Sequence, residues 1–295
     1  MIVPFVQALV LYAAFTLGYP WFSAWCGARL PEGNLSWLIV EASALGLVCV
    51  LVALTRGLSH AGGSRSRAHP GCAWSDARAV PFQALFLLGL AALALRIIDP
   101  GFDSQEIGQQ GLEAAGLLTG FFLTLPFAVA AEQLIFRTCQ SRLRTLLPPG
   151  PAVVAVGLAF AIYHWVPGTP LDRHAIETQL ATFAGGMVFA AAYERTDNLW
   201  MLIAIHLVYD CLAVAQALLN VRHARGAEVA VFLLWLASSG VLAWRWHRPG
   251  AGSTADRATE SRLERAMHPA AAWAAAAIFG CGFPLLLVWI RIRLG

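Results

Sequence analysis

Residues 112–146, LEAAGLLTGFFLTLPFAVAAEQLIFRTCQSRLRTL, form a long apolar run that holds a carboxylate, Glu132, in its interior. A helix that spans a bilayer needs about 20 mostly apolar residues, so this run is long enough to cross a membrane. Strands are excluded, because an open sheet edge finds no hydrogen-bonding partner in lipid. The run therefore predicts a transmembrane helix, and its excess length predicts an interfacial turn before the span.

Similar apolar runs occur along the whole chain. Of its 295 residues, 58% are hydrophobic and only 13% are charged, whereas soluble domains are about one-quarter charged. We predict an all-α fold, a polytopic transmembrane helix bundle of about eight to nine spans. The candidate spans are 2–25, 35–55, 80–98, 112–146, 150–166, 175–194, 199–219, 228–247 and 269–291.

Composition divides the chain into three regions with two polar linkers. We predict N-terminal transmembrane helices over 1–110, a central helix core over 111–220 and C-terminal transmembrane helices over 221–295. The linkers, 56–79 and 248–268, are rich in small and charged residues.

The basic residues indicate how the chain is oriented. All 20 are arginine, and they cluster in loops between apolar runs, which is typical of membrane topology and not of nucleic-acid binding. Twelve arginines fall on the side of the two long linkers and seven on the other side. The positive-inside rule then predicts a cytoplasmic N-terminus. The absence of lysine fits a GC-rich bacterial genome, so we predict an integral protein of a bacterial inner membrane.

Three central helices carry polar residues that are costly in lipid, about 2.5–3.5 kcal/mol for each ionisable group on insertion scales. These residues are Glu132, Gln133 and Arg137 on the first helix, His164 on the second, and His206 and Asp210 on the third. The i,i+4 spacing puts His206 and Asp210 on one helical face. At a rise of 1.5 Å per residue, the two carboxylates and two imidazoles reach a similar depth, about 12–20 Å from one membrane face. They can therefore converge.

The sequence lacks the residues that several known classes of intramembrane protease require. The sequence has no HExxH motif for a zinc protease. The closest string to a serine-protease turn, 238–240, has no histidine in the interior of its span. Asp210 has no GxGD motif to supply a second intramembrane aspartate. The pattern that remains is Glu-x-x-x-x-Arg, Phe-x-x-x-His and His-x-x-x-Asp.

These motifs read Glu132-Gln133-Leu-Ile-Phe-Arg137, Phe160-Ala-Ile-Tyr-His164 and His206-Leu-Val-Tyr-Asp210. They resemble the EExxxR, FxxxH and HxxxN or HxxxD motifs of the CAAX-protease and bacteriocin-processing (CPBP or ABI) family, which includes the Ras-converting CAAX endopeptidases. The string YERTDNLW at 193–200 is similar to this family as well. The resemblance covers roughly 110–220.

The resemblance implies an intramembrane endopeptidase that cuts a membrane-associated or C-terminally anchored peptide. Glu132 would be the general base, and His164 would hold and polarise the attacking water. His206 and Asp210 would stabilise the oxyanion.

Three further residues would support the site, namely Gln133, Arg137 and Phe160, the last by packing beside His164. Arg137 lies near a helix end, where a snorkelling side chain is the simpler interpretation. Glu194 lies near the end of its span as well, and we expect it to be solvated.

Two residues depart from the family pattern. Gln133 replaces the second glutamate, so Arg137 loses a charged i,i+4 partner, although the amide can keep one hydrogen bond. Asp210 stands where many members have asparagine. An ionised carboxylate repels an oxyanion, so Asp210 would act either as a neutral donor or by holding His206 as imidazolium.

No cofactor is favoured by the resemblance, which implies a metal-free, glutamate-dependent mechanism. Glu132, His164 and His206 are nevertheless an acceptable three-ligand set for catalytic Zn²⁺, which stays the alternative. The six cysteines form no CxxC motif and no Cys/His ligand spacing.

The expected partners are the lipid bilayer and a membrane-anchored peptide or protein substrate, without nucleic acid; the sequence carries no signal for an oligomeric state. Two alternatives stay open, a proton-coupled transporter and a non-catalytic membrane scaffold or immunity protein of the same fold. A transporter usually shows internal repeats or broken helices, which we do not find in the sequence. Glu132 and His164 argue against a scaffold, whereas Gln133 leaves it open.

Overall fold

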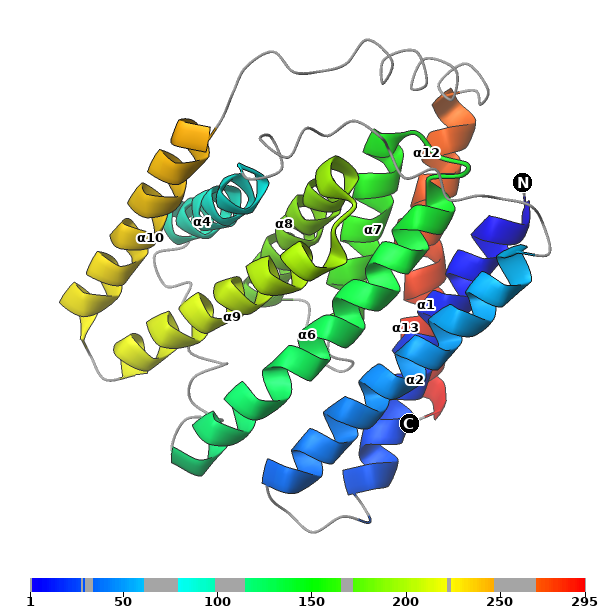
Figure 1. Cartoon of the computed structure of the whole chain (residues 1–295), viewed down its shortest axis with the longest axis horizontal. Helices are drawn as coiled ribbons and strands as arrows, with labels where there is room; N and C mark the ends of the chain where they lie inside the picture. The colour runs from blue at the N-terminus through cyan, green and yellow to red at the C-terminus, as the bar shows by residue number, and fades with distance from the viewer. Residues whose placement is uncertain are drawn as a thin grey trace.

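The computed structural model describes residues 2–27, 29, 34–60, 79–98, 115–165, 172–221, 224–246 and 269–294. Every regular element in these ranges is a helix, which confirms the predicted fold class. The elements are α1 (Ile2–Gly27), α2 (Asn34–His60), α4 (Val80–Ile98), α6 (Ala115–Leu143), α7 (Pro149–Tyr163), α8 (Arg173–Thr196), α9 (Leu199–Val221), α10 (Arg225–Trp246), α12 (Pro269–Ala277), the π-helix η1 (Ile278–Gly282) and α13 (Phe283–Leu294) (Figure 1).

The helices have the length and composition of membrane spans. Within the described ranges, eight helical segments are long and apolar enough to cross a bilayer, and α7 is a shorter apolar helix of 15 residues. The predicted count of about eight to nine spans is confirmed. Large apolar side chains also cover the outside, as at Trp200 and Trp244, which are 78% and 80% exposed. This exposure is expected where lipid is the solvent.

Two boundaries differ from the sequence-based expectation. Within 112–146, the chain from Ala115 to Leu143 is one continuous helix of 29 residues, without a break before the span. The linker expected from residue 56 begins later, because α2 continues to His60. The rest of that linker up to 78, and the linker 248–268, lie outside the described residues.

The long helix α6 lies in the middle of the bundle (Figure 1). α1 and α2 pack along α6 on one side, and α7 and α9 also contact it. α4 and α10 pack against each other at the opposite edge, where both contact α9 and α4 also contacts α8. The C-terminal rod of α12, η1 and α13 packs on α7 and α1. The three helices that carry the sequence motifs, α6, α7 and α9, thus lie between these two groups of outer helices.

A buried cluster fixes α1, α6 and α7 to one another. The hydroxyl of Tyr12 in α1 donates to the carbonyl oxygen of Ala159 in α7 at 2.9 Å. The ring of Tyr12 packs edge-on against Phe136 of α6, with 6.0 Å between centroids. Helices in lipid associate through such packing and interhelical hydrogen bonds, because burial from water contributes little between them.

α7 and α8 approach each other closely at two glycines. A Cβ atom at Gly186 would lie 3.0 Å from the Cα of Gly157 and 3.0 Å from the Cβ of Phe160. Small residues let helix backbones approach in membranes. This contact therefore sets the position of Phe160 between the two helices.

The turn between α8 and α9 sets the position of the third motif. Asp197 ends α8 in the left-handed region with φ 47°, and its N–H donates to the carbonyl of Tyr193 at 2.8 Å. Asn198 then caps α9, because its Oδ1 accepts from the N–H of Met201 at 3.1 Å. Aspartate and asparagine favour these conformations, since their short polar side chains bond to nearby backbone. The chain thus reverses and brings His206 of α9 against α6.

Candidate active site

The structure brings Glu132 of α6 and His164 of α7 face to face. Oε1 of Glu132 lies 3.6 Å from Nε2 of His164, and the two side chains are 17% and 34% exposed. This distance is longer than a direct hydrogen bond but short enough for strong electrostatic interaction. Both groups are therefore partly shielded and yet reachable.

The imidazole of His164 is oriented by the end of its own helix. His164 is the C-cap of α7, and its Nδ1 lies 2.8 Å from the carbonyl oxygen of Phe160. A carbonyl oxygen only accepts hydrogen bonds, so Nδ1 carries a hydrogen. In the neutral ring Nε2, the atom that faces Glu132, is then the basic nitrogen.

This arrangement presents two hydrogen-bond acceptors to one small space. The ionised carboxylate of Glu132 only accepts, and neutral Nε2 of His164 also accepts. A water molecule that donates one hydrogen to each is held by both groups, and its oxygen becomes more nucleophilic as a proton moves towards the carboxylate. The pair can therefore perform general-base chemistry on water.

His206 lies beside this pair and is buried, with 6% of its surface exposed. Its Nε2 lies 3.5 Å from Oδ2 of Asp210, one turn further along α9. Its Nδ1 lies 2.8 Å from Nε2 of Gln133 on α6. His206 also interacts electrostatically with Glu132, and His164 with Asp210. The two predicted carboxylates and two predicted imidazoles thus form one electrostatic cluster.

Two buried phenylalanines hold the imidazoles in place. The ring of Phe160 contacts His164 at 4.4 Å between centroids and lies 6.1 Å from His206. Phe189 of α8 packs on the other ring, 4.5 Å from His206. Phe160 and Phe189 are 4% and 1% exposed. Each imidazole therefore rests on a fixed aromatic face.

The position of Arg137 near a helix end had indicated a side chain that snorkels to the surface, but the structure shows that it does not. The residue is 1% exposed, and its Nη1 donates to Oε1 of Gln140. Gln140 in turn donates through Nε2 to the carbonyl of Ala190 and to Oε1 of Glu194, both at 2.9 Å. Arg137 is therefore part of a buried polar network that joins α6 to α8.

Glu194 is not solvated, contrary to the sequence-based expectation. Its Oε2 accepts from Nε of Arg144 at 2.8 Å, and the Glu194 side chain is 15% exposed. The carboxylate thus compensates two cations, Arg144 directly, in the turn after α6, and Arg137 of α6 through Gln140. This network fixes the half of α6 that follows Glu132.

The alternative zinc set does not gain support from the geometry. In the part of the chain that the structure describes, no group of three or more His, Cys, Asp and Glu side chains is placed to hold a metal ion. Glu132, His164 and His206 therefore do not form a ligand set. Nδ1 of His164 bonds to a carbonyl oxygen and Nδ1 of His206 to an amide.

Sequence reasoning missed two aromatic residues of this region. Phe189 carries no polar group and lies on a helix without a motif, so nothing in the sequence marked it. Tyr163 directly precedes His164 and packs edge-on against it at 5.0 Å. Tyr163 also stacks on Phe15 of α1 at 5.0 Å, which ties the site to the N-terminal helices.

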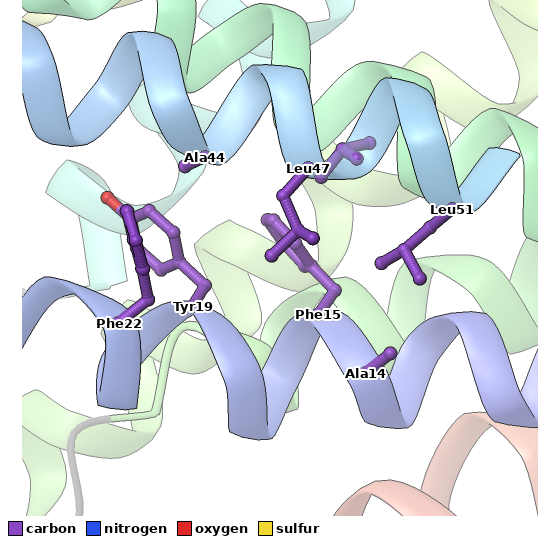
Figure 2. A pocket seen from close by; sticks show the side chains of 8 residues that line it. Ala14, Phe15, Tyr19, Phe22, Ala44, Leu47 and Leu51 are labelled. Carbon is purple, nitrogen blue, oxygen red and sulfur yellow. The ribbon is translucent and has the colours of Figure 1, made fainter.

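An apolar pocket lies between α1 and α2 next to this contact. Figure 2 shows side chains of both helices pointing into the space between them. Phe15 and Tyr19 line it from α1, and the hydroxyl of Tyr19 donates to the buried carboxylate of Glu41 in α2. The pocket lining is Ala14, Phe15, Tyr19, Phe22, Ala44, Leu47, Val48 and Leu51.

Fold and site together define a class of protein, an all-helical integral membrane protein whose central helices gather two carboxylates and two imidazoles. Residues 114–212 match a family model described as Rce1-like, type II CAAX prenyl endopeptidase Rce1-like. This match supports a CAAX-protease-like family for the central part of the chain and confirms the resemblance predicted from the three motifs. No curated protein and no solved structure matches the chain.

Proposed function

We propose that the protein is an intramembrane endopeptidase that hydrolyses a peptide bond in a membrane-associated or C-terminally anchored substrate. The observation that carries this proposal is the pair formed by Glu132 and His164, 3.6 Å apart, with Nδ1 of the imidazole held by the Phe160 carbonyl. The family match supports proteolysis as the class of reaction.

In the proposed mechanism Glu132 is the general base. It takes one proton from a water held between its carboxylate and Nε2 of His164, while the water oxygen attacks the carbonyl carbon of the scissile bond. The carbonyl π-electrons move to oxygen and form a tetrahedral oxyanion. When this intermediate collapses, the C–N bond breaks, and the proton held by Glu132 passes to the leaving nitrogen. No covalent enzyme intermediate is needed.

The oxyanion requires hydrogen-bond donors fixed before the reaction, because such donors lower the barrier without reorganisation. His206 and, in its protonated form, Asp210 are the proposed donors, since they lie on the neighbouring helix and interact electrostatically with Glu132 and His164. Phe160 and Phe189 keep water from the buried side of this cluster.

The arginine distribution supports a cytoplasmic N-terminus, and we propose that orientation for the enzyme. The substrate is then a peptide or protein held in the same membrane by its own anchor. An anchor of this kind raises the local concentration of the scissile bond at the site and removes the need for a large soluble docking surface.

The test uses the purified full chain in liposomes with a library of membrane-anchored peptides, and mass spectrometry identifies the products. Glu132→Gln and His164→Asn remove the two groups of the pair. Glu228→Gln is the matched control, because Glu228 is also a buried carboxylate in a span but pairs with Arg96 away from the site. We expect cleavage by the wild type and the control, and losses of at least about 100-fold in both site variants.

Each reaction is run with and without a chelator. Activity that does not respond to chelation supports the glutamate mechanism, whereas loss restored by added metal replaces it with a metal-dependent one. Cleavage that survives both substitutions overturns the site. A proton flux into the liposomes that requires Glu132, without cleavage of any peptide, would replace the protease with the transporter.

A further inference from the structure

Gln133 makes a contact that decides where the hydrogen of a neighbouring imidazole resides. Its side chain is fully buried, and its amide nitrogen Nε2 lies 2.8 Å from Nδ1 of His206. An amide nitrogen donates hydrogen bonds and does not accept them, so Nδ1 of His206 must be the acceptor. An imidazole whose Nδ1 accepts is neutral and carries its hydrogen on Nε2.

We infer that Gln133 is a positioning residue that holds His206 as the neutral tautomer with its hydrogen on Nε2, so that the ring presents a donor beside Asp210. Nε2 of His206, the ring nitrogen that Gln133 does not contact, lies 3.5 Å from Oδ2 of Asp210. This inference rests on the proposed function, in which a donor at that atom stabilises the oxyanion.

The surroundings of the ring agree with a neutral imidazole. Phe189 of α8 and Phe160 of α7 cover the ring and bring no charge. Arg137, one turn after Gln133 on α6, is a buried cation that interacts electrostatically with His206. The positive charge of Arg137 disfavours protonation of the imidazole to a cation.

The remaining charged or titratable groups around the His206 ring come from three different helices. Glu132 acts on it from α6 and His164 from the end of α7, while Asp210 faces it from α9. The carboxylates attract a proton to the ring, whereas the positive charge of Arg137, and that of His164 whenever its imidazole is protonated, repels it. The hydrogen bond from Gln133 is the contact that distinguishes the two ring nitrogens, because it occupies Nδ1 alone.

The tautomer matters because the opposite one reverses the function of the ring. With its hydrogen on Nδ1, neutral His206 would direct a lone pair at the site, and a lone pair repels a developing oxyanion. A preorganised donor at the same place is worth about 10²–10³-fold in turnover. A side chain that sets the tautomer thus acts on catalysis without touching the substrate.

The tautomer is read by solid-state NMR on the full chain, labelled with ¹⁵N-histidine and reconstituted in lipid bilayers. The His206 signals are assigned by their loss in His206→Asn. We expect the wild type to show a proton bonded to Nε2 and none on Nδ1. A proton on Nδ1, alone or together with one on Nε2, would overturn the inference, since the amide oxygen would then face the ring.

Substitutions of Gln133 test the cause. In Gln133→Glu the carboxylate only accepts, so we expect a proton to appear on Nδ1 of His206. In Gln133→Met neither ring nitrogen has a fixed partner on α6, and we expect a mixture of tautomers with a fall in kcat of about 100-fold and little change in KM. An unchanged NMR pattern in both variants would contradict the inference.

Gln216→Glu is the matched control, because it makes the same chemical change at a different buried glutamine, which lies on α9 and accepts from Arg96. We expect this variant to keep the wild-type His206 signals. The NMR reading does not depend on peptide cleavage. A proton on Nε2 without any peptidase activity would therefore count against the proposed function and leave the assignment of the tautomer standing.

Discussion

Oε1 of Glu132 and Nε2 of His164 face each other at 3.6 Å, although the two residues lie on different helices and 32 positions apart (164 − 132). The histidine closes α7 as its C-cap, so the helix end itself presents the ring to α6. A pair built in this way depends on the packing of two helices and on one carbonyl, and each part can be tested separately.

Glu132→Gln should remove catalysis and keep the fold. Glutamine has nearly the same shape but cannot take a proton from water, so we expect kcat to fall by about 10²–10⁴-fold. Turnover of an anchored peptide gives kcat, and circular dichroism checks helix content. Turnover of the variant within tenfold of that of Glu228→Gln would show that Glu132 is not the base.

A substitution at His164 can separate the roles of its two ring nitrogens. Asparagine keeps a donor for the Phe160 carbonyl but removes the nitrogen that faces Glu132. We expect His164→Asn to keep the thermal stability of the wild type and to lose about 100-fold or more in kcat. A variant that loses stability and activity together would indicate a structural role for the ring.

Gly186→Ala should separate α7 from α8. The new Cβ would lie 3.0 Å from both the Cα of Gly157 and the Cβ of Phe160, and overpacking of this kind costs about 1–3 kcal/mol. We expect a lower unfolding midpoint in detergent and reduced turnover, because Phe160 supports His164.

The matched control for this substitution is Gly46→Ala in α2, where a Cβ meets nothing within 4 Å. Alanine should be neutral or slightly stabilising there, by about 0.5–1 kcal/mol in helix propensity. Equal midpoints for the Gly186 and Gly46 variants would contradict the close approach of α7 and α8.

Gln140→Leu should destabilise the protein by removing the neighbour of a buried cation. Arg137 donates to Gln140, and a hydrogen bond to a charged group contributes about 1.5–3 kcal/mol. Denaturant unfolding in mixed micelles measures the loss. Thr145→Val, at an exposed position just after α6, should change stability by less than about 0.5 kcal/mol.

Asp210→Asn tests whether the carboxylate must hold His206. If Gln133 already fixes the ring, asparagine at 210 should keep turnover within about tenfold, which is about 1.4 kcal/mol. Since asparagine does not titrate, this variant should also lose any part of the pH dependence that comes from Asp210. Complete loss of turnover at every pH would instead show that a carboxylate is required to orient the ring.

The sequence by itself determined the helices and the motif residues. Apolar runs such as 199–219 become helices because a backbone in lipid must satisfy its own hydrogen bonds, and α9 follows that run closely, from Leu199 to Val221. Ionisable residues in such runs are costly, so Glu132, His206 and Asp210 were visible as candidates without any structure. Their order along the chain was enough to predict the resemblance that the match of residues 114–212 supports.

Only the tertiary structure decided which of these side chains meet. The i,i+4 spacing indicates that Gln133 and Arg137 share a helical face, but it does not indicate which neighbouring helix that face meets. In the structure Gln133 contacts His206 of α9, and Arg137 contacts Gln140 of its own helix. Partner choice depends on distances between helices, which are set by packing contacts remote in sequence, such as the one between Gly157 and Gly186.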